Sequence, residues 1–165
     1  SDQVESPEIY FLSLGNGYKS IPFFGEKDSI TINTKLDKFE LKAEIKGSEN
    51  QELLNKYNDM IKQFNNKNLD LIKEDFEARK SGYQDSIILV ENKRLRLLKT
   101  QSLYAVNFAI QNADHEVAPY IALTEINTAN IQLLDTINKS LTPTIKASKY
   151  GKQLDEAIVK LKANQ

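Results

Sequence analysis

The sequence predicts an α+β fold, in which a small N-terminal antiparallel β-sheet is followed by a long antiparallel helical hairpin and shorter C-terminal helices. Two observations predict it. Strand-forming residues with a period of two occupy much of residues 8–46, and beyond them the apolar period changes to about 3.5. Two helical segments of nearly equal length, about 49–80 and 83–113, then flank Ser81-Gly82, which is a natural helix stop.

The first two predicted strands form a β-hairpin. Glu8–Leu14 is rich in strand formers, and Asn16-Gly17 directly after it supplies the positive φ angles that a tight turn needs. Tyr18–Phe24 returns beside it. Pro22 restricts this strand to a sheet edge or a bulge, because proline has no N–H to donate to a neighbouring strand.

Two further strands are predicted before the helices. Asp28–Asn33 is short, whereas Phe39–Lys46 alternates perfectly between apolar and charged residues, which predicts one buried and one wet face. The residues expected on the buried face are Phe39, Leu41, Ala43 and Ile45.

The helical hairpin is expected to begin at a capping box, in which the Ser48 hydroxyl accepts from an early backbone N–H and the Gln51 side chain reaches back. Each arm is expected to be roughly 45–48 Å long. Asn65–Asn68 forms helix poorly, so the first arm could bend there. The stripe expected to be buried comprises Leu53, Tyr57, Met60, Phe64, Leu71 and Phe76 on the first arm, with Leu54, Ile61 and Ile72 beside it, and Ile88, Leu95, Leu98, Ser102, Ala105, Val106, Ala109 and Ile110 on the second.

Shorter helices are predicted to pack after the hairpin. They cover Val117–Asn127, Asn130–Ser140 and a C-terminal stretch that begins near Tyr150-Gly151. Thr142-Pro143 has the pattern of an N-cap followed by proline at the first helical position. We expect a single domain, divided into a β-region at 1–47, the hairpin at 48–113 and packing helices at 114–165.

The composition excludes several classes of function. A formal net charge of −1 gives no electrostatic excess toward nucleic acid or a membrane surface. Cysteine is absent, which removes thiolate nucleophiles and zinc–thiolate sites. No apolar run approaches about 18 residues, so no membrane span is expected. The lysine-rich stretch at 139–165 predicts a solvated helix face, with a weak docking surface for an acidic partner as the alternative.

No residues have the pattern of an active site. His115 is the only histidine, and its place at an expected helix start favours a solvated or capping position over catalysis. Three carboxylates cluster on the first arm, but glycoside hydrolysis needs two of them flanking a cleft. These carboxylates, Glu74, Asp75 and Glu77, are expected to pair in water with Lys73, Arg79 and Lys80.

Other candidate binding motifs are equally weak. Lys93–Lys99 is the densest basic stretch, but it is expected on an ordinary helix surface with Leu95 and Leu98 facing inward. Gly15-Asn16-Gly17 precedes a strand and lacks the Lys-Ser/Thr of a phosphate loop. The aromatic residues of the first strands are assigned to the core and not to a ligand pocket; they are Tyr10, Phe11, Phe23 and Phe24. We therefore predict no catalytic, cofactor-binding or metal-binding residues, and no cofactor.

Three groups of motifs follow one another in a recognisable order. The first is Pro7–Leu12, Ile21–Glu26 and Asp28–Ile32; the second is Ile45–Asn50, leading into the charged helix; the third is Asn112–Tyr120, Leu141–Pro143 and Ser148–Lys152. In this order, over about residues 5–163, they resemble the N-terminal domain of unknown function that precedes the thioredoxin-like domain in TlpA/ResA-type thiol–disulfide oxidoreductases of Bacteroidetes.

The resemblance implies a periplasmic or cell-envelope protein, often lipid-anchored, with further strands before Ser1 and a thioredoxin-like domain with its Cys-x-x-Cys after Lys162. The redox residues of that family have no counterpart in this sequence. We therefore expect a non-catalytic accessory or interaction domain. Its partner would be the covalently linked thioredoxin-like domain, another protein or a second copy of the chain.

Three alternatives stay open. The chain could be a free-standing envelope protein that binds a partner through its helical hairpin or through an exposed edge of Phe39–Lys46. An enzyme built from carboxylates and tyrosines is the second alternative. A prefoldin-like chaperone also combines strands with a helical hairpin, but the helices after Val117 argue against that analogy.

Overall fold

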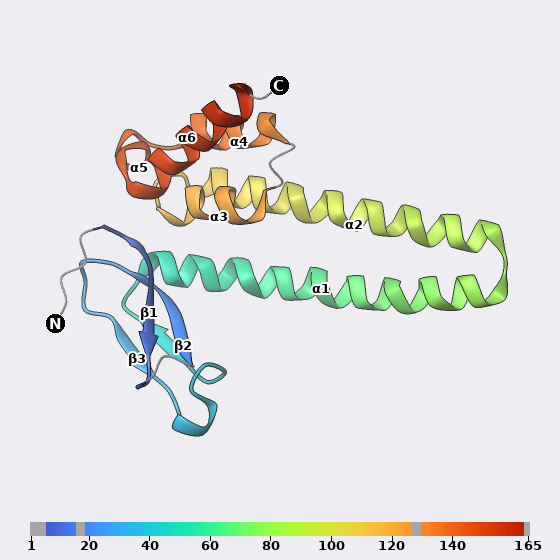
Figure 1. Ribbon diagram of the computed structural model, residues 1–165, viewed down its shortest axis with the longest axis horizontal. Coiled ribbons are helices and arrows are strands. Elements are labelled where there is room, and N and C mark those ends of the chain that lie inside the picture. The colour runs from blue at the N-terminus through green and yellow to red at the C-terminus, as the bar shows by residue number, and fades with distance from the viewer. Residues whose placement is uncertain (1–5, 16–18, 127–129, 164–165) are drawn as a thin grey trace.

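The computed structural model describes residues 6–15, 19–126 and 130–163, and it confirms the predicted α+β fold class. The β-region and the short helices lie together at one end of the molecule, which we call the base. The two long helices project from the base as a hairpin (Figure 1). The first strand and the last helix of the described chain both lie at the base, far from the hairpin tip (Figure 1).

The strands pair as two short antiparallel ribbons. β1 (Glu8–Ser13) pairs with β2 (Ser20–Gly25), and β3 (Thr31–Asn33) pairs with β4 (Glu44–Lys46). Among the described residues β2 has β1 as its only partner strand, so Pro22 lies in an edge strand as predicted. The turn predicted at Asn16-Gly17 falls outside the described residues.

The long strand predicted at Phe39–Lys46 is wrong except for its last three residues. A 3₁₀ helix at Leu36–Lys38 and turns replace its first part. The neighbouring strand β3 is only three residues long, so no described strand pairs with residues 39–43. Phe39 is buried at 4% exposure, but Leu41 is 87% exposed, because none of the described residues covers its side chain.

Two nearly equal helices form the hairpin. α1 spans Glu49–Ser81 and α2 spans Gln84–Gln111. The Ser48 hydroxyl accepts from the Gln51 N–H at 3.0 Å, which confirms half of the capping box. The chain reverses at Gly82, whose φ of 72° suits the left-handed conformation that ends α1. The run Asn65–Asn68 does not interrupt α1.

Four shorter helices complete the base. They are α3 (Val117–Glu125), α4 (Ile131–Ser140), α5 (Pro143–Ala147) and α6 (Lys149–Ala163). Thr142 caps α5 and Pro143 is its first residue, as predicted. The predicted C-terminal end of the α3 segment, at Asn127, lies outside the described residues.

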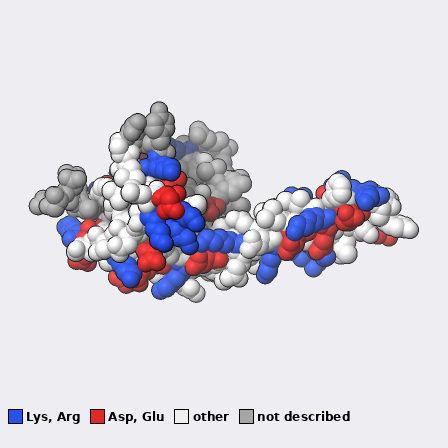
Figure 2. All heavy atoms as spheres, turned by 90° about the horizontal axis from the view of Figure 1, so that it is seen from below, with Lys and Arg blue, Asp and Glu red and all other residues white. Residues whose placement is uncertain are grey.

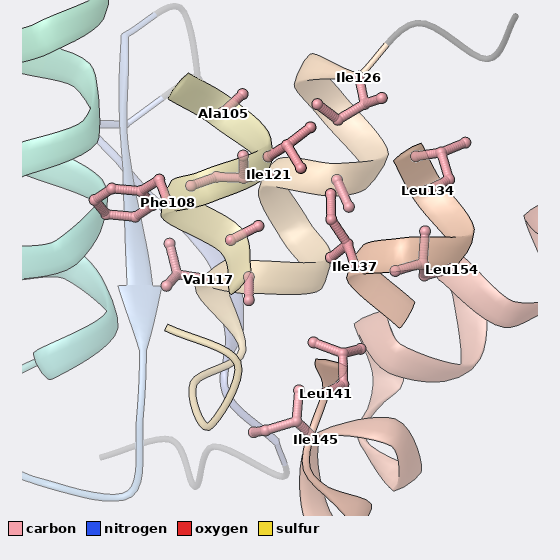
Figure 3. Packing of buried hydrophobic residues seen from close by; sticks show 14 of the residues in the cluster. Ala105, Phe108, Val117, Ile121, Ile126, Leu134, Ile137, Leu141, Ile145 and Leu154 are labelled. Atoms are coloured by element: carbon pink, nitrogen blue, oxygen red, sulfur yellow. The ribbon is translucent and has the colours of Figure 1, made fainter. Parts of the chain in front are cut away.

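The hydrophobic core lies where α2, α3, α4 and α6 meet (Figure 3). Ile121, Ile137 and Leu154 point toward one another there and are shielded from solvent. Full burial of each such side chain stabilises the fold by roughly 1.5–3 kcal/mol. Phe24 of β2 joins the same cluster, and its ring contacts the rings of Tyr120 and Tyr150 edge-on. The core therefore belongs to the base, and it binds the β-region to the helices.

Candidate interaction surface on the helical hairpin

A seam of side chains joins α1 to α2. Buried or half-buried residues recur at alternating steps of three and four along both helices, the spacing of an antiparallel coiled coil. The apolar members are Tyr57, Ile61, Phe64, Leu71 and Ala78 on α1, and Ile87, Val90, Leu97, Tyr104 and Phe108 on α2. Near the base the seam is aromatic: the rings of Tyr57 and Tyr104 stack with centroids 5.7 Å apart.

Polar residues interrupt the same seam. Asn68 and Asp75 on α1 and Arg94 and Gln101 on α2 occupy seam positions and are half-buried. The hydrogen bond from Arg79 holds the pKa of the Asp75 carboxyl below its usual value, while the other carboxylate oxygen of Asp75 is buried without a hydrogen bond. The outer part of the hairpin is therefore held by a seam that is poorer in apolar contacts than the base.

Two ion pairs mark the two flanks of this seam. On one flank Lys93 Nζ lies 2.6 Å from a carboxylate oxygen of Glu74. On the other flank Arg79 Nη2 lies 3.3 Å from a carboxylate oxygen of Glu91. Residues three, four or seven positions from a member of a pair share its side of the helix. The pairs thus identify which residues of α1 and α2 lie on a common face of the hairpin.

Large apolar side chains collect on the flank of the Arg79–Glu91 pair. On α1, Phe76, Ile72 and Leu69 lie three, seven and ten positions before Arg79. On α2, Ile88 lies three positions before Glu91, and Leu95 and Leu98 lie four and seven positions after it. We call this set the hairpin strip; it consists of Leu69, Ile72, Phe76, Ile88, Leu95 and Leu98. These side chains are 45–65% exposed, so the strip has no partner among the described residues of this chain.

The strip corrects part of the sequence prediction. Ile72, Phe76, Ile88, Leu95 and Leu98 were expected on or beside the buried seam, but all five face outward. The prediction assigned every recurring apolar residue of the two helices to the seam, whereas four of the nine seam positions beyond Phe64 and Tyr104 are polar. The sequence contains a signal for the strip. Each helix has two rows of apolar residues at helical spacing, whereas contact between two helices needs only one row on each.

The surface of the hairpin that is visible in Figure 2 has a different character. There Lys and Arg side chains lie beside Asp and Glu side chains along the projecting hairpin (Figure 2). Lys62–Asp59 and Lys73–Asp70 are ion pairs within α1, at 2.9 and 3.4 Å. Such exposed pairs contribute about 0.2–1 kcal/mol each and leave the surface well solvated.

A groove of about 980 Å³ opens where the hairpin meets the base. Leu98, Ser102 and Ala105 bring the face of the hairpin strip into it, and the first residues of α4 form its other wall. Its floor includes Tyr57, whose hydroxyl donates to a Glu125 carboxylate oxygen at 3.4 Å. Burial, reinforced by that carboxylate, raises the pKa of Tyr57. The groove and the strip form one continuous surface.

The residues quoted for the family resemblance meet elsewhere, at the junction between β-region and helices. A carboxylate oxygen of Glu26 accepts from the Ser48 hydroxyl and from the Asn50 N–H, each at 2.7 Å. Instead of reaching back to the cap, the Gln51 side chain accepts from the N–H of Phe24 at 2.7 Å. This differs from the predicted capping box because a buried strand N–H requires a partner.

The third motif group closes the junction from the other side. The Asn50 carboxamide oxygen accepts from the Val117 N–H at 2.8 Å, so α1 is joined to the start of α3. The Tyr150 hydroxyl accepts from the Ile9 N–H at 3.0 Å, and Lys149 forms an ion pair with Glu8. These motifs therefore fix how the parts of the base fit together, and their polar groups are occupied in doing so.

His115 is neither solvated nor a cap, in contrast to the prediction. Its ring is largely covered, with Nδ1 2.8 Å from an Asp114 carboxylate oxygen and Nε2 3.3 Å from one of Glu49. Burial disfavours the charged imidazolium, but the contacts with Asp114 and Glu49 outweigh it, so the pKa of His115 is raised. Neither acid orients it toward a nucleophile.

The remaining sequence candidates occupy separate places. Asp75 pairs with Arg79 as expected, whereas Glu74 reaches across the hairpin to Lys93. Among the first-strand aromatics, Phe24 is fully buried but Phe11 is 65% exposed, so the assignment to the core is wrong for Phe11. In the lysine-rich stretch, Lys139 and Lys162 both pair with Asp135.

Across 6–15, 19–126 and 130–163, no group of three His, Cys, Asp or Glu side chains is placed to hold a metal ion. In the same part of the chain no helix has the length and apolar character needed to cross a membrane.

By comparison with known proteins, residues 1–54 match a domain of unknown function (DUF4369). The match covers β1 to β4 and the first turn of α1, which includes Ser48, Asn50 and Gln51 of the junction. No curated protein and no solved structure matches the chain.

Proposed function

We propose that this chain is a non-catalytic interaction module whose projecting hairpin is a docking arm. The observation that supports this proposal is the hairpin strip, in which six large apolar side chains lie on one face of an arm that extends away from the core. Contiguous exposed apolar patches of several hundred Å² mark interaction sites on soluble proteins. The polar groups of the junction are used structurally, whereas the strip has no partner among the described residues.

We further propose that the module is an accessory domain of a cell-envelope thioredoxin-like disulfide oxidoreductase. The motif order described above and the domain match over residues 1–54 support this proposal. The chain contains no cysteine, so thiol chemistry would come from a linked or bound thioredoxin-like domain. A free-standing envelope binding protein is the alternative, and it would use the same strip. The two differ in whether the gene also encodes a Cys-x-x-Cys domain.

Site-specific photo-cross-linking tests the docking arm. A photoreactive residue replacing Leu95 in the hairpin strip is expected to give covalent adducts in cells that produce the whole gene product. The matched control replaces Thr100, which is exposed on the opposite side of the same helix. Adducts at Leu95 and none at Thr100 support the proposal. Equal yields at the two positions, or none at either, would contradict it.

A further inference from the structure

The hairpin strip has the size of one half of a small protein interface. Its six side chains are 45–65% exposed. Large apolar side chains expose roughly 200 Å² when free, so the strip offers about 600 Å² per chain and two facing strips would bury about 1,200 Å². That value lies at the lower limit for specific complexes, which predicts a weak and reversible pairing.

The charge of this face suits a copy of itself. The six strip residues are uncharged, and Arg79 and Glu91, which lie between them, pair with each other. Lys73, Lys80 and Lys99 lie three or four positions from strip residues and border the strip. A second strip can lie on the centre of this face without bringing like charges together there, because Arg79 and Glu91 neutralise each other.

The groove lies at the place that the hairpin tip of a second, antiparallel chain would reach. The strip is centred near Ile72 and Leu95. At 1.5 Å per residue the hairpin tip at Tyr83 lies roughly 16 Å from Ile72 on one side, and Leu103 in the groove lies roughly 12 Å from Leu95 on the other. Tyr83 is 73% exposed and the groove is open. If two strips meet antiparallel about a two-fold axis, each tip reaches the groove of the other chain.

We propose that two copies of this chain pair through their hairpin strips in this antiparallel arrangement, with Tyr83 of each chain in the groove of the other. The pairing forms a four-helix bundle from two hairpins, with the two bases at opposite ends. In this bundle the apolar residues of the hairpin strip, which do not face the other helix of their own hairpin, pack against the second chain. The inference rests on the proposed function, because it names the partner of the same docking arm.

Sedimentation of the 165-residue chain tests the pairing. The 18.8 kDa chain is expected to sediment as a dimer at high concentration and to dissociate on dilution. Ile72→Glu is expected to weaken the association more than about tenfold, because it introduces a charge at the centre of the interface. Thr100→Glu adds the same charge on the opposite side of α2 and is expected to have no effect. A monomer at all concentrations, or equal effects of the two substitutions, would overturn the pairing.

Cross-linking tests the arrangement without relying on a disruptive substitution. The chain has no cysteine of its own, so introduced thiols report alone. Chains carrying Tyr83→Cys, mixed with chains carrying Leu103→Cys, are expected to form a disulfide-linked heterodimer under mild oxidation. Thr100→Cys chains mixed with Leu103→Cys chains are expected not to form one, because Thr100 is exposed on the opposite side of α2 from the strip. A dimer by sedimentation without the Tyr83–Leu103 link would overturn the antiparallel arrangement.

The result also separates this inference from the proposed function. A monomeric chain that still forms Leu95 photo-adducts with a different protein would overturn the self-pairing and leave the docking arm in place. A monomeric chain without strip-specific adducts would overturn both. Photo-adducts at Leu95 that contain two copies of the chain would support both.

Discussion

At the residue scale, three buried polar side chains at the start of α1 decide how the β-region meets the helices. Ser48, Asn50 and Gln51 are all less than 6% exposed. Each provides an oxygen to a backbone N–H, and two of these N–H groups belong to other elements: Phe24 in β2 and Val117 in α3. Buried polar groups are tolerated only when paired, so each of these contacts constrains its neighbours.

Gln51→Leu should therefore destabilise the fold although leucine is apolar and of similar size. The substitution leaves the buried N–H of Phe24 without its acceptor, which costs about 1–3 kcal/mol. Urea unfolding followed by circular dichroism measures the change. Glu52→Gln, on the exposed side of the same turn, should stay within about 0.5 kcal/mol of the parent chain. If the two variants unfold at the same urea concentration, the Gln51–Phe24 hydrogen bond contributes nothing.

His115 makes stability depend on pH in a defined direction. Its folded-state pKa is raised above the usual 6.5 by Asp114 and Glu49 despite its burial. The folded state therefore binds the proton more tightly than the unfolded chain, and the stabilisation is complete below pH 6.5 and lost as pH rises through the folded-state pKa. The urea midpoint should fall between pH 6 and pH 8. His115→Gln should remove this part of the pH dependence, and an unchanged slope in that variant would contradict the assignment.

At the element scale, α5 and α6 approach too closely for any side chain at Gly151. A Cβ there would lie 2.0 Å from the carbonyl oxygen of Ile145 and 2.8 Å from the Cα of Lys146. Gly82 differs: a Cβ at the hairpin tip would meet no atom within 4 Å, but its φ is 72°. One glycine is required by packing and the other by backbone conformation.

Gly151→Ala should consequently destabilise the chain, although alanine is favoured over glycine inside a helix by about 1 kcal/mol. The added methyl group must push α6 away from α5, and overpacking of this kind costs roughly 1–3 kcal/mol. Gly82→Ala serves as the comparison, since it strains only the tip. Thermal unfolding followed at 222 nm measures both. A gain in stability for Gly151→Ala would show that α5 and α6 separate freely.

Sequence patterns predicted the elements that local interactions determine, and they failed for the strand that needs a neighbouring strand to pair with. The helices, the Ser48 cap and the Gly82 stop were predictable because local spacing and capping determine them. Phe39–Lys46 alternates equally well between apolar and charged residues. This alternation predicts that a strand would have one buried and one wet face, but it does not predict that another strand is present to pair with it. With β3 only three residues long, Leu41 has no described strand to pack against.

The candidate surface was predictable only in part for a related reason. Apolar periodicity located both hairpin helices, but it could not decide which apolar row faces the other helix. The choice depends on pairings such as Arg79–Glu91 and on polar seam residues such as Asn68 and Arg94, which only the folded hairpin shows. Leu95 was therefore assigned to the seam when it belongs to the strip.

At the scale of the whole molecule, the base and the arm are stabilised differently. The main cluster of buried residues lies at the base, and the arm beyond Phe64 is held mainly by a seam interrupted with polar side chains. Local stability follows buried apolar contacts, so the arm should open more readily than the base. An arm that a partner stabilises on docking is consistent with this division.

The base should therefore fold without the outer arm. Deleting residues 67–80 and 85–98 removes 14 residues from each helix, which preserves the seven-residue phase of the seam and keeps the tip at Gly82. The core and the stacked rings of Tyr57 and Tyr104 remain, so near-ultraviolet circular dichroism should stay native-like and unfolding should stay cooperative. Self-association should disappear with the strip. A shortened chain that lacks a cooperative transition would show that the base depends on the arm, and that the docking surface cannot be separated from the fold.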